Sequence, residues 1–170
     1  MSTLANAGRI LTAGAILNGI IAQYDFHTVV MGDPQPEGSM RIGRNRNARR
    51  PYIEQDNERL DPWRAKIAKT IAGQRGDDAP MYDEPVVLRL VFVMPRPAKP
   101  MFSHVPGTKP DLDKLVRGVS DALMMAKLIR EDGRIVAYDR TVKVWPGADA
   151  EGLDVPGVRI YLRRLVRDDD

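Results

Sequence analysis

The sequence predicts an α/β (α+β) protein with a single domain, built on a mixed β-sheet with two main helices. Residues 85–94 (PVVLRLVFVM) form a near-continuous apolar run, which is typical of a strand that is covered on both faces. Two segments, around 62–71 and 114–128, place apolar residues at helical spacing. The 170 residues, 43% of them hydrophobic, suffice for one domain with a substantial core.

The other elements follow along the chain. A strand is expected over 24–31, which is rich in aromatic and β-branched residues. The first main helix should begin at Pro62, with Asp61 as its N-cap. Its buried stripe consists of Leu60, Trp63, Ile67 and Ile71. Two more strands are expected over 135–145 and 157–166, and the second alternates apolar with polar residues.

A loop over 95–110 separates the central strand from the second helix. It has prolines at positions 95, 97, 100, 106 and 110, so it cannot pair as a central strand, and it is long for a small domain. These properties favour a functional loop that delivers the residues following it. His104 in this loop is a candidate to contact a phosphate, although no partner lies near it in the sequence.

The segment 1–22 is apolar, but glycines interrupt it and no basic region precedes it. It is too polar and broken to span a bilayer, and it lacks the pattern of a signal sequence. We expect residues 1–22 to be an appended extension, helical or disordered, that packs on the domain or on a partner subunit. Residues 23–170 should form the domain, and no membrane association is expected.

The composition limits which metal sites and cross-links the chain can form. The chain has no cysteine, which excludes disulfides and thiolate metal sites and makes the reducing cytoplasm the natural compartment. His27 and His104 with acids are a poor set for zinc. The net charge of +3 and the pI near 9.3 are too small an excess to establish nucleic-acid binding by themselves.

Asp111 and Asp113 are the most informative residues of the chain. Acids at positions i and i+2 of an extended segment point to the same side. Mg²⁺ and Mn²⁺ take carboxylate oxygens and keep water and phosphate as further ligands, so such a pair could hold an ion that activates water against a phosphodiester. The alternative is that Asp113 is only the N-cap of the following helix.

The stretch from Thr108 to Trp145 resembles the core of the RusA family of Holliday junction resolvases. The family pattern has a D-L-D-N-L helix opening, a basic residue four positions later, a D-A-L in the helix, an acidic turn and a strand that ends in lysine. These positions are occupied here by Asp111, Asp113, Leu115, Arg117, Asp121-Ala122-Leu123, Glu131-Asp132 and Lys143. Two positions depart from the pattern: Lys114 replaces the usual Asn, and Arg117 replaces the usual lysine.

The resemblance implies a RusA-like fold, a homodimer and cleavage of four-way DNA junctions with Mg²⁺. It implies that Asp111, Asp113 and Asp132 are the metal-binding catalytic acids and that Arg117 takes the place of a catalytic lysine. Arg117 keeps the charge but exchanges a compact ammonium for a planar fork. Lys143 and Arg117 would hold phosphates.

Five arginines without an intervening acid lie between Met40 and Pro51, where they could neutralise DNA phosphates. The segment follows a Pro-rich stretch that resembles the P-x-P-K-G-R-x-R loop of RusA-like proteins, with Glu37-Gly38-Ser39 in place of K-G-R. The alternative is a solvated surface or a disordered arm. The predicted DNA-binding residues are Arg41, Arg44, Arg46, Arg49, Arg50, Lys109, Lys114 and Lys143.

A geometric difficulty concerns Asp132. A helix of some 15 residues would separate it from Asp113 by roughly 22 Å, beyond a shared metal shell. Either the acidic turn folds back along a shorter helix, or Asp132 completes the site of a second subunit. Asp139 is the rival within the chain on distance alone.

These observations together predict a Mg²⁺-dependent endodeoxyribonuclease that resolves Holliday junctions as a homodimer. A less selective nuclease for flaps or replication forks is the first alternative, because the residues define the chemistry better than the substrate. A catalytically silent DNA-binding module is the second.

Overall fold

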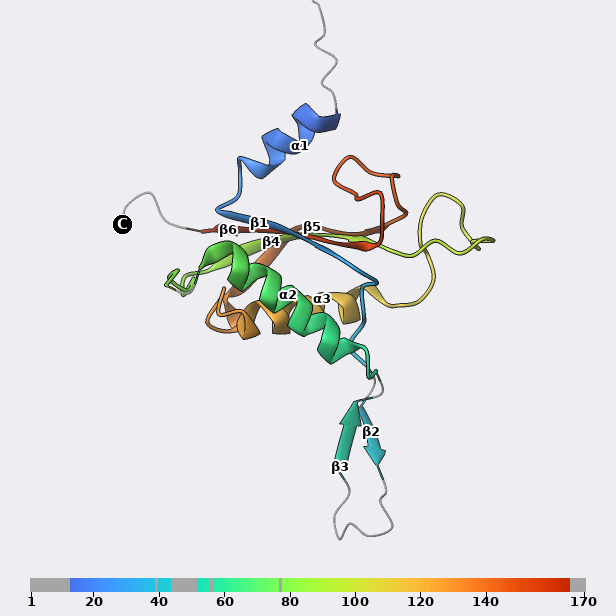
Figure 1. Ribbon diagram of the computed structural model, residues 1–170, viewed down its shortest axis with the longest axis horizontal. Coiled ribbons are helices and arrows are strands. Elements are labelled where there is room, and N and C mark those ends of the chain that lie inside the picture. The colour runs from blue at the N-terminus through green and yellow to red at the C-terminus, as the bar shows by residue number, and fades with distance from the viewer. Residues whose placement is uncertain (1–12, 39, 44–51, 56, 77, 166–170) are drawn as a thin grey trace, which may run out of the picture.

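The computed structural model describes residues 13–38, 40–43, 52–55, 57–76 and 78–165 (Figure 1). Its main sheet has four strands, in the spatial order β1 (Phe26–Met31), β6 (Gly157–Arg164), β4 (Val86–Val93) and β5 (Ile135–Val144). Strand β6 is antiparallel to β1 and β4, whereas β4 and β5 are parallel. The predicted mixed sheet is confirmed, and β4 lies inside it, as its continuous apolar composition indicated.

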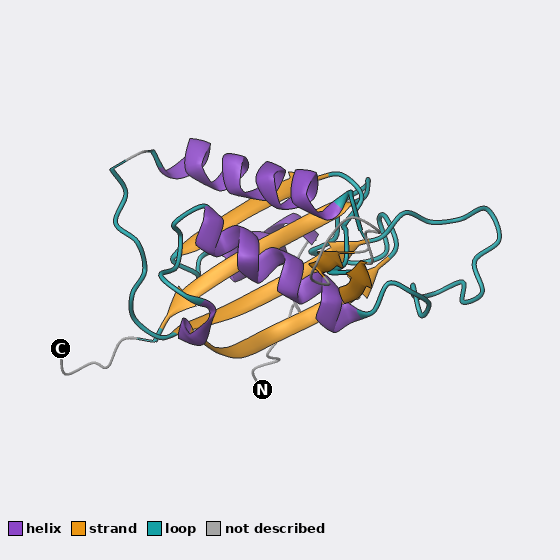
Figure 2. Ribbon diagram, turned by 90° about the horizontal axis from the view of Figure 1, so that it is seen from below, coloured by secondary structure: helices purple, strands orange, loops and turns teal. Residues whose placement is uncertain are grey.

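Helices α2 (Leu60–Arg75) and α3 (Leu112–Met125) cover one face of this sheet (Figures 1 and 2). Helix α3 lies in the connection from β4 to β5, because parallel neighbours cannot be joined by a tight turn. Every second residue of β4 faces the helices and is buried. The core between sheet and helices includes Leu88, Leu90, Phe92, Ile160, Ile67, Ile71, Leu115 and Val119.

The opposite face of the sheet carries charged and aromatic side chains. The register places Arg89 of β4 beside Tyr161 of β6, on the side away from the helices. Glu151, in the loop between β5 and β6, is only 3% exposed and accepts hydrogen bonds from Arg89 Nε and Arg140 Nη1, each at 2.7 Å. Arg140 also donates to Asp149 at 2.5 Å. We call Arg89, Arg140, Asp149 and Glu151 the arginine network.

The helix boundaries differ from the sequence expectation. Helix α2 begins at Leu60, so Asp61 lies in its first turn, 3.5 Å from Arg64, and is not the N-cap. Trp63 is buried in the core, as predicted. Helix α3 begins at Leu112 and ends at Met125, each about two or three residues earlier than expected. The early end arises because the chain turns at Lys127, which has φ of 53°.

The arginine-rich segment holds a short antiparallel hairpin, which the sequence did not reveal. Its strands are β2 (Met40–Gly43) and β3 (Tyr52–Gln55), and Arg41 of β2 is in register with Glu54 of β3. The hairpin projects from the body in Figure 1. Arg44, Arg46, Arg49 and Arg50 lie outside the described residues.

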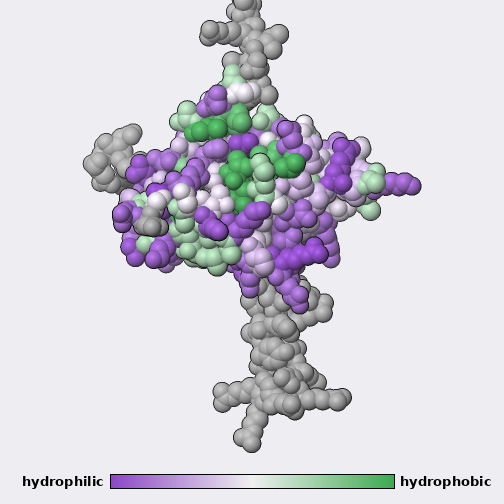
Figure 3. Space-filling view, in the orientation of Figure 1, coloured by the Kyte–Doolittle hydropathy of each residue, from purple (hydrophilic) through white to green (hydrophobic). Residues whose placement is uncertain are grey.

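The N-terminal extension contains α1 (Ala13–Ile21), and residues 1–12 lie outside the described part. The helix is apolar, yet Ile16 is 40% exposed, and Figure 3 shows apolar surface at its position and on the body beneath it. Within the described residues, no helix combines the length and apolar character that crossing a membrane requires.

Candidate active site

The two carboxylates that the sequence singled out stand at the start of α3. Asp111 occupies the N-cap position with an extended backbone (φ −68°, ψ 140°), but its side chain makes no capping hydrogen bond and is 52% exposed. Asp113 lies in the first helical turn and is exposed. Capping by Asp113 is therefore not what the structure shows. Both carboxylates are accessible beside the positive end of a helix.

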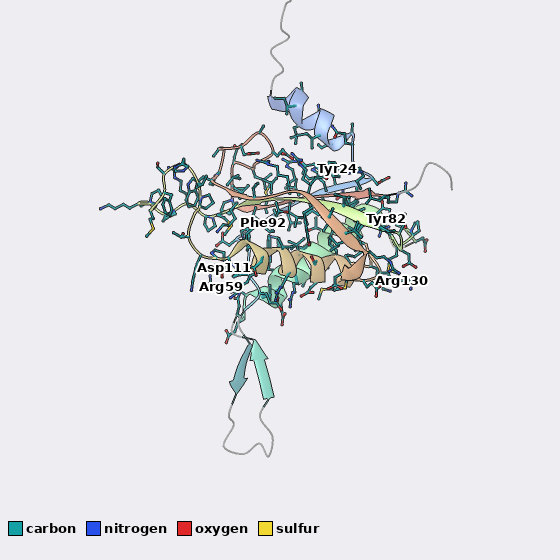
Figure 4. The ribbon with its side chains drawn as sticks, turned by 180° about the vertical axis from the view of Figure 1, so that it is seen from behind. Tyr24, Arg59, Tyr82, Phe92, Asp111 and Arg130 are labelled. Atoms are coloured by element: carbon teal, nitrogen blue, oxygen red, sulfur yellow. The ribbon has the colours of Figure 1, made fainter. Side chains whose placement is uncertain are left out.

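A hollow of about 470 Å³ opens at this end of α3. Its charged lining is Asp33, Glu37, Arg59, Lys109, Asp111 and Lys114. Lys114 Nζ lies 3.9 Å from an oxygen of Asp111, so a cation and a carboxylate share the opening. Figure 4 shows Arg59 and Asp111 near one another at the foot of the hairpin. Sequence reasoning missed Arg59, whose only signal was its place just before a helix.

Lys143 fixes the segment that carries the carboxylates. Its ammonium donates to the carbonyl oxygens of Thr108 at 2.7 Å and Pro110 at 2.8 Å. Burial lowers the pKa of Lys143, while the charge of Asp111 opposes that shift. The residue thus ties β5 to the end of the 95–110 loop, directly before Asp111. Contact of Lys143 with DNA remains a prediction.

Arg117 lies one turn further along α3 and pairs with Glu37 at 3.6 Å. The loop that carries Glu37 approaches α3 closely because residue 118 is glycine: a Cβ there would lie 3.2 Å from the Gln35 oxygen. The Glu37 N–H also donates to the Lys114 carbonyl at 3.0 Å. Glu37, which stands where the RusA-like loop pattern has a lysine, thus faces Arg117 of α3. Arg117 is nevertheless 67% exposed.

Asp132 starts a short 3-10 helix, η1 (Asp132–Arg134), and lines a second hollow of about 430 Å³ on the flank of α3. Glu37, Arg117 and Asp121 also line it, so Glu37 borders both hollows. Burial raises the pKa of Asp121, the Arg64 charge opposes this, and the charges of Glu37 and Asp132 add to the rise. The acidic turn therefore folds back to the flank of α3.

The fold-back does not complete a metal shell. Among the described residues, no three acids or histidines form a group that could hold a metal ion. Asp111 and Asp113 belong to one end of a helix that is about 20 Å long, and Asp132 reaches its flank beside Asp121. One chain brings Asp132 together with Arg117, but not with the Asp111 pair.

Asp139, the rival third acid, lies elsewhere. Its carboxylate accepts a hydrogen bond from the Tyr24 hydroxyl at 2.8 Å, and Arg163 lies at 3.5 Å. The Tyr24 ring is 5.1 Å from that of Tyr161, which belongs to the sheet face away from α3. Asp139 therefore faces away from Asp111. His104 is exposed on the 95–110 loop.

Accessible carboxylates beside cations at a helix start suit chemistry on nucleic-acid phosphates, because carboxylates can hold a catalytic metal ion and cations neutralise phosphates. The sequence model of the family described as Endodeoxyribonuclease RusA matches residues 32–160, which is most of the chain. The chain therefore belongs to the RusA endodeoxyribonuclease family. Comparison with curated proteins gives no match. The family match spans Asp111, Asp113, Arg117, Asp132 and Lys143, and leaves α1 outside.

Proposed function

We propose that the protein is a Mg²⁺-dependent, structure-specific endodeoxyribonuclease that resolves Holliday junctions by paired nicks in DNA recombination and repair. The observation that carries this proposal is the family match across a D-x-D pair whose carboxylates are accessible and not used for capping. Mn²⁺ should substitute for Mg²⁺, because both are hard cations that take oxygen ligands.

Asp111, Asp113 and Asp132 would hold the ion. Their donor atoms are all carboxylate oxygens, which suits Mg²⁺, and the chain has no cysteine to favour a softer metal. The bound ion would lower the pKa of a water molecule and supply the nucleophile for phosphodiester hydrolysis. Arg117 and Lys114 would orient phosphate oxygens, which requires the Arg117 fork to exchange Glu37 for the DNA.

Phosphate contacts along the DNA would come from the basic residues that the sequence singled out. The hairpin and the 95–110 loop both project from the end at which α3 begins (Figure 1). The proposed DNA-binding residues are Arg41, Arg44, Arg46, Arg49, Arg50, Lys109, Lys114 and Lys143. Such contacts position the duplex without reading its sequence.

A homodimer would provide two matched sites for the two scissile strands of a junction. Because one chain does not bring Asp132 to the Asp111 pair, we propose that Asp132 of the partner subunit completes each site. The N-terminal extension, residues 1–22, lies outside the family match and carries the apolar helix α1. We propose that it packs on the domain or on the partner subunit.

Mixing two inactive proteins tests the shared site. Asp113→Asn and Asp132→Asn chains, mixed after exchange is shown with tagged protein, should form heterodimers with one intact site and nick one strand. If each site takes all its acids from one chain, every heterodimer carries two damaged sites. If the mixture is inactive although exchange is confirmed, Asp132 does not complete the site of the partner subunit.

Cleavage of a labelled four-way junction tests the function directly. With Mg²⁺, the protein should introduce two symmetric nicks, whereas a linear duplex of the same sequence should stay intact. A flap and a replication fork serve as further substrates. If the protein cuts the flap or the fork faster than the junction, it is a less selective nuclease and not a junction resolvase. If the protein binds these substrates but cleaves none of them with Mg²⁺ or Mn²⁺, it is a DNA-binding module without nuclease activity.

A further inference from the structure

The loop over 95–110 projects from the body beside the start of α3 (Figures 1 and 2). It is held in shape by contacts along its length. Arg96 Nη2 donates to the Ser103 carbonyl at 3.1 Å, and Trp145 Nε1 of the body donates to the Phe102 carbonyl at 3.3 Å. Its five prolines each fix a backbone φ angle. These contacts and prolines hold the loop in a defined conformation.

The loop exposes three large apolar side chains. Met101 is 78% exposed, Phe102 43% and Val105 42%. Phe102 packs over Gly107, where a Cβ would lie 2.8 Å from the ring, so the glycine lets the ring fold onto the loop. We call Met101, Phe102 and Val105 the loop tip. Large apolar side chains that stay exposed on a projecting loop indicate a surface that binds a partner.

The charges around the loop tip indicate a nucleic acid. Every charged residue between Met94 and Pro110 is basic, namely Arg96, Lys99 and Lys109, and no acid occurs there. Figure 3 shows hydrophobic residues, in pale green, beside strongly hydrophilic ones, in purple, on this projection. A basic stem attracts phosphates, while apolar side chains have an affinity for the faces of bases.

The position of the loop relates it to the carboxylates. Its last residues, Lys109 and Pro110, line the 470 Å³ hollow together with Asp111. Lys143 holds the same end of the loop through two carbonyl oxygens. A DNA strand whose phosphate lies at Asp111 would therefore pass beside the base of this loop.

We propose that the loop tip docks on base faces exposed at the branch point of DNA and so makes the protein prefer branched DNA to continuous duplex. In continuous duplex each base pair is stacked between neighbours and offers only its edges to a protein. A branch point exposes or weakly stacks the faces of its terminal pairs, which an aromatic ring and a thioether can cover at little unstacking cost. This inference rests on the proposed function and explains why the proposed nuclease would select branched DNA over duplex.

The test compares binding to a four-way junction and to a duplex of the same sequence, without divalent cations so that no cutting is needed. The variant Met101→Ser/Phe102→Ser should bind the junction about tenfold more weakly and leave duplex binding unchanged, since each lost stacking contact has roughly that effect. Phe102→Tyr keeps an aromatic ring and should bind as the wild type does. Met31→Ser, at another exposed methionine, on β1 (59%), is the control.

Equal weakening on junction and duplex, or no change on either, would overturn the inference. So would a change of sedimentation coefficient in the double variant, since the tip would then contact a second copy of the chain. If the double variant melts early, Met101→Ser alone decides, because that side chain is 78% exposed. A wild-type chain that binds both DNAs equally would also overturn the inference, because there would be no preference to explain. The proposed function would fail only if the chain did not cut the junction with Mg²⁺, which the cleavage assay tests separately.

Discussion

Acids and arginines meet in two regions of this protein, and the two regions use them differently. In the arginine network, Glu151 is buried and each carboxylate accepts hydrogen bonds from guanidinium groups. At the start of α3, Asp111 is 52% exposed, makes no capping hydrogen bond and lies 3.9 Å from Lys114 Nζ. The first arrangement fixes the β5–β6 loop on the sheet. The second leaves carboxylate oxygens accessible to a ligand.

The difference shows that residue type does not separate structural from functional charges. Burial of Glu151 alone would raise its pKa, but the hydrogen bond and charge of Arg89, together with Tyr161 and the charge of Arg140, outweigh burial and leave the pKa lowered. Such a pair is satisfied within the fold. Carboxylates that no guanidinium satisfies keep their oxygens for an external cation, as the proposed metal site requires.

The largest expected effect lies at the exposed carboxylates. Asp111→Asn or Asp113→Asn should reduce junction cleavage by more than about 100-fold, because a metal ligand that also stabilises transition-state charge is lost. Junction binding should stay near wild type, since phosphate contacts come from other residues. Gel assays of cleavage and binding measure both quantities. Cleavage retained in both variants would remove the D-x-D pair from the active site.

The arginine network should show the opposite behaviour. Glu151→Gln should lower the free energy of unfolding by about 3 kcal/mol, because it leaves the Arg89 guanidinium, which is only 19% exposed, without its charged partner. Junction binding per folded molecule should be unchanged. Glu84→Gln is the control, because Glu84 is 36% exposed and lies 3.6 Å from Arg164, so its loss should hardly affect unfolding. Equal denaturation midpoints for the two variants would show that the buried network adds no stability.

A third prediction concerns the arginine-rich segment between Met40 and Pro51, which contains no acid. Arg44→Ala, Arg46→Ala and Arg49→Ala together should weaken binding to every DNA shape. They should also flatten the log–log salt dependence of binding by roughly 2.7, since each lost phosphate contact removes about 0.9. Thermal unfolding should not change. If the salt dependence is unaltered, these arginines do not contact DNA phosphates and the segment is only a solvated surface.

The smallest effect is the response of the arginine network to pH. The pKa values of Asp149 and Glu151 are lowered from their ordinary 3.8 and 4.5, so both carboxylates stabilise the fold above those values. This contribution is lost as pH falls below 4.5 and through the lowered values. Unfolding by urea between pH 3 and 6 should show a shallower acid decline for Glu151→Gln than for wild type. Parallel curves would contradict the assigned shift.

The sequence by itself determined the core of the fold and the identity of the candidate acids. The continuous apolar run of β4 placed that strand inside the sheet, because only a strand covered on both faces can bury every side chain. The spacing of Asp111, Asp113 and Asp132 carried the family resemblance, which the match over residues 32–160 confirmed. Periodicity and motif order are local properties, so a single sequence contains them.

Tertiary structure alone decided which charges meet. Arg89 and Glu151 are 62 residues apart, Arg117 pairs with Glu37 across a loop, and Lys143 holds the segment before Asp111 from a distant strand. No local pattern distinguishes a buried, paired arginine from one that is free to bind phosphate. The strand register and the close approach allowed by Gly118 set these distances, and they are consequences of packing the whole chain.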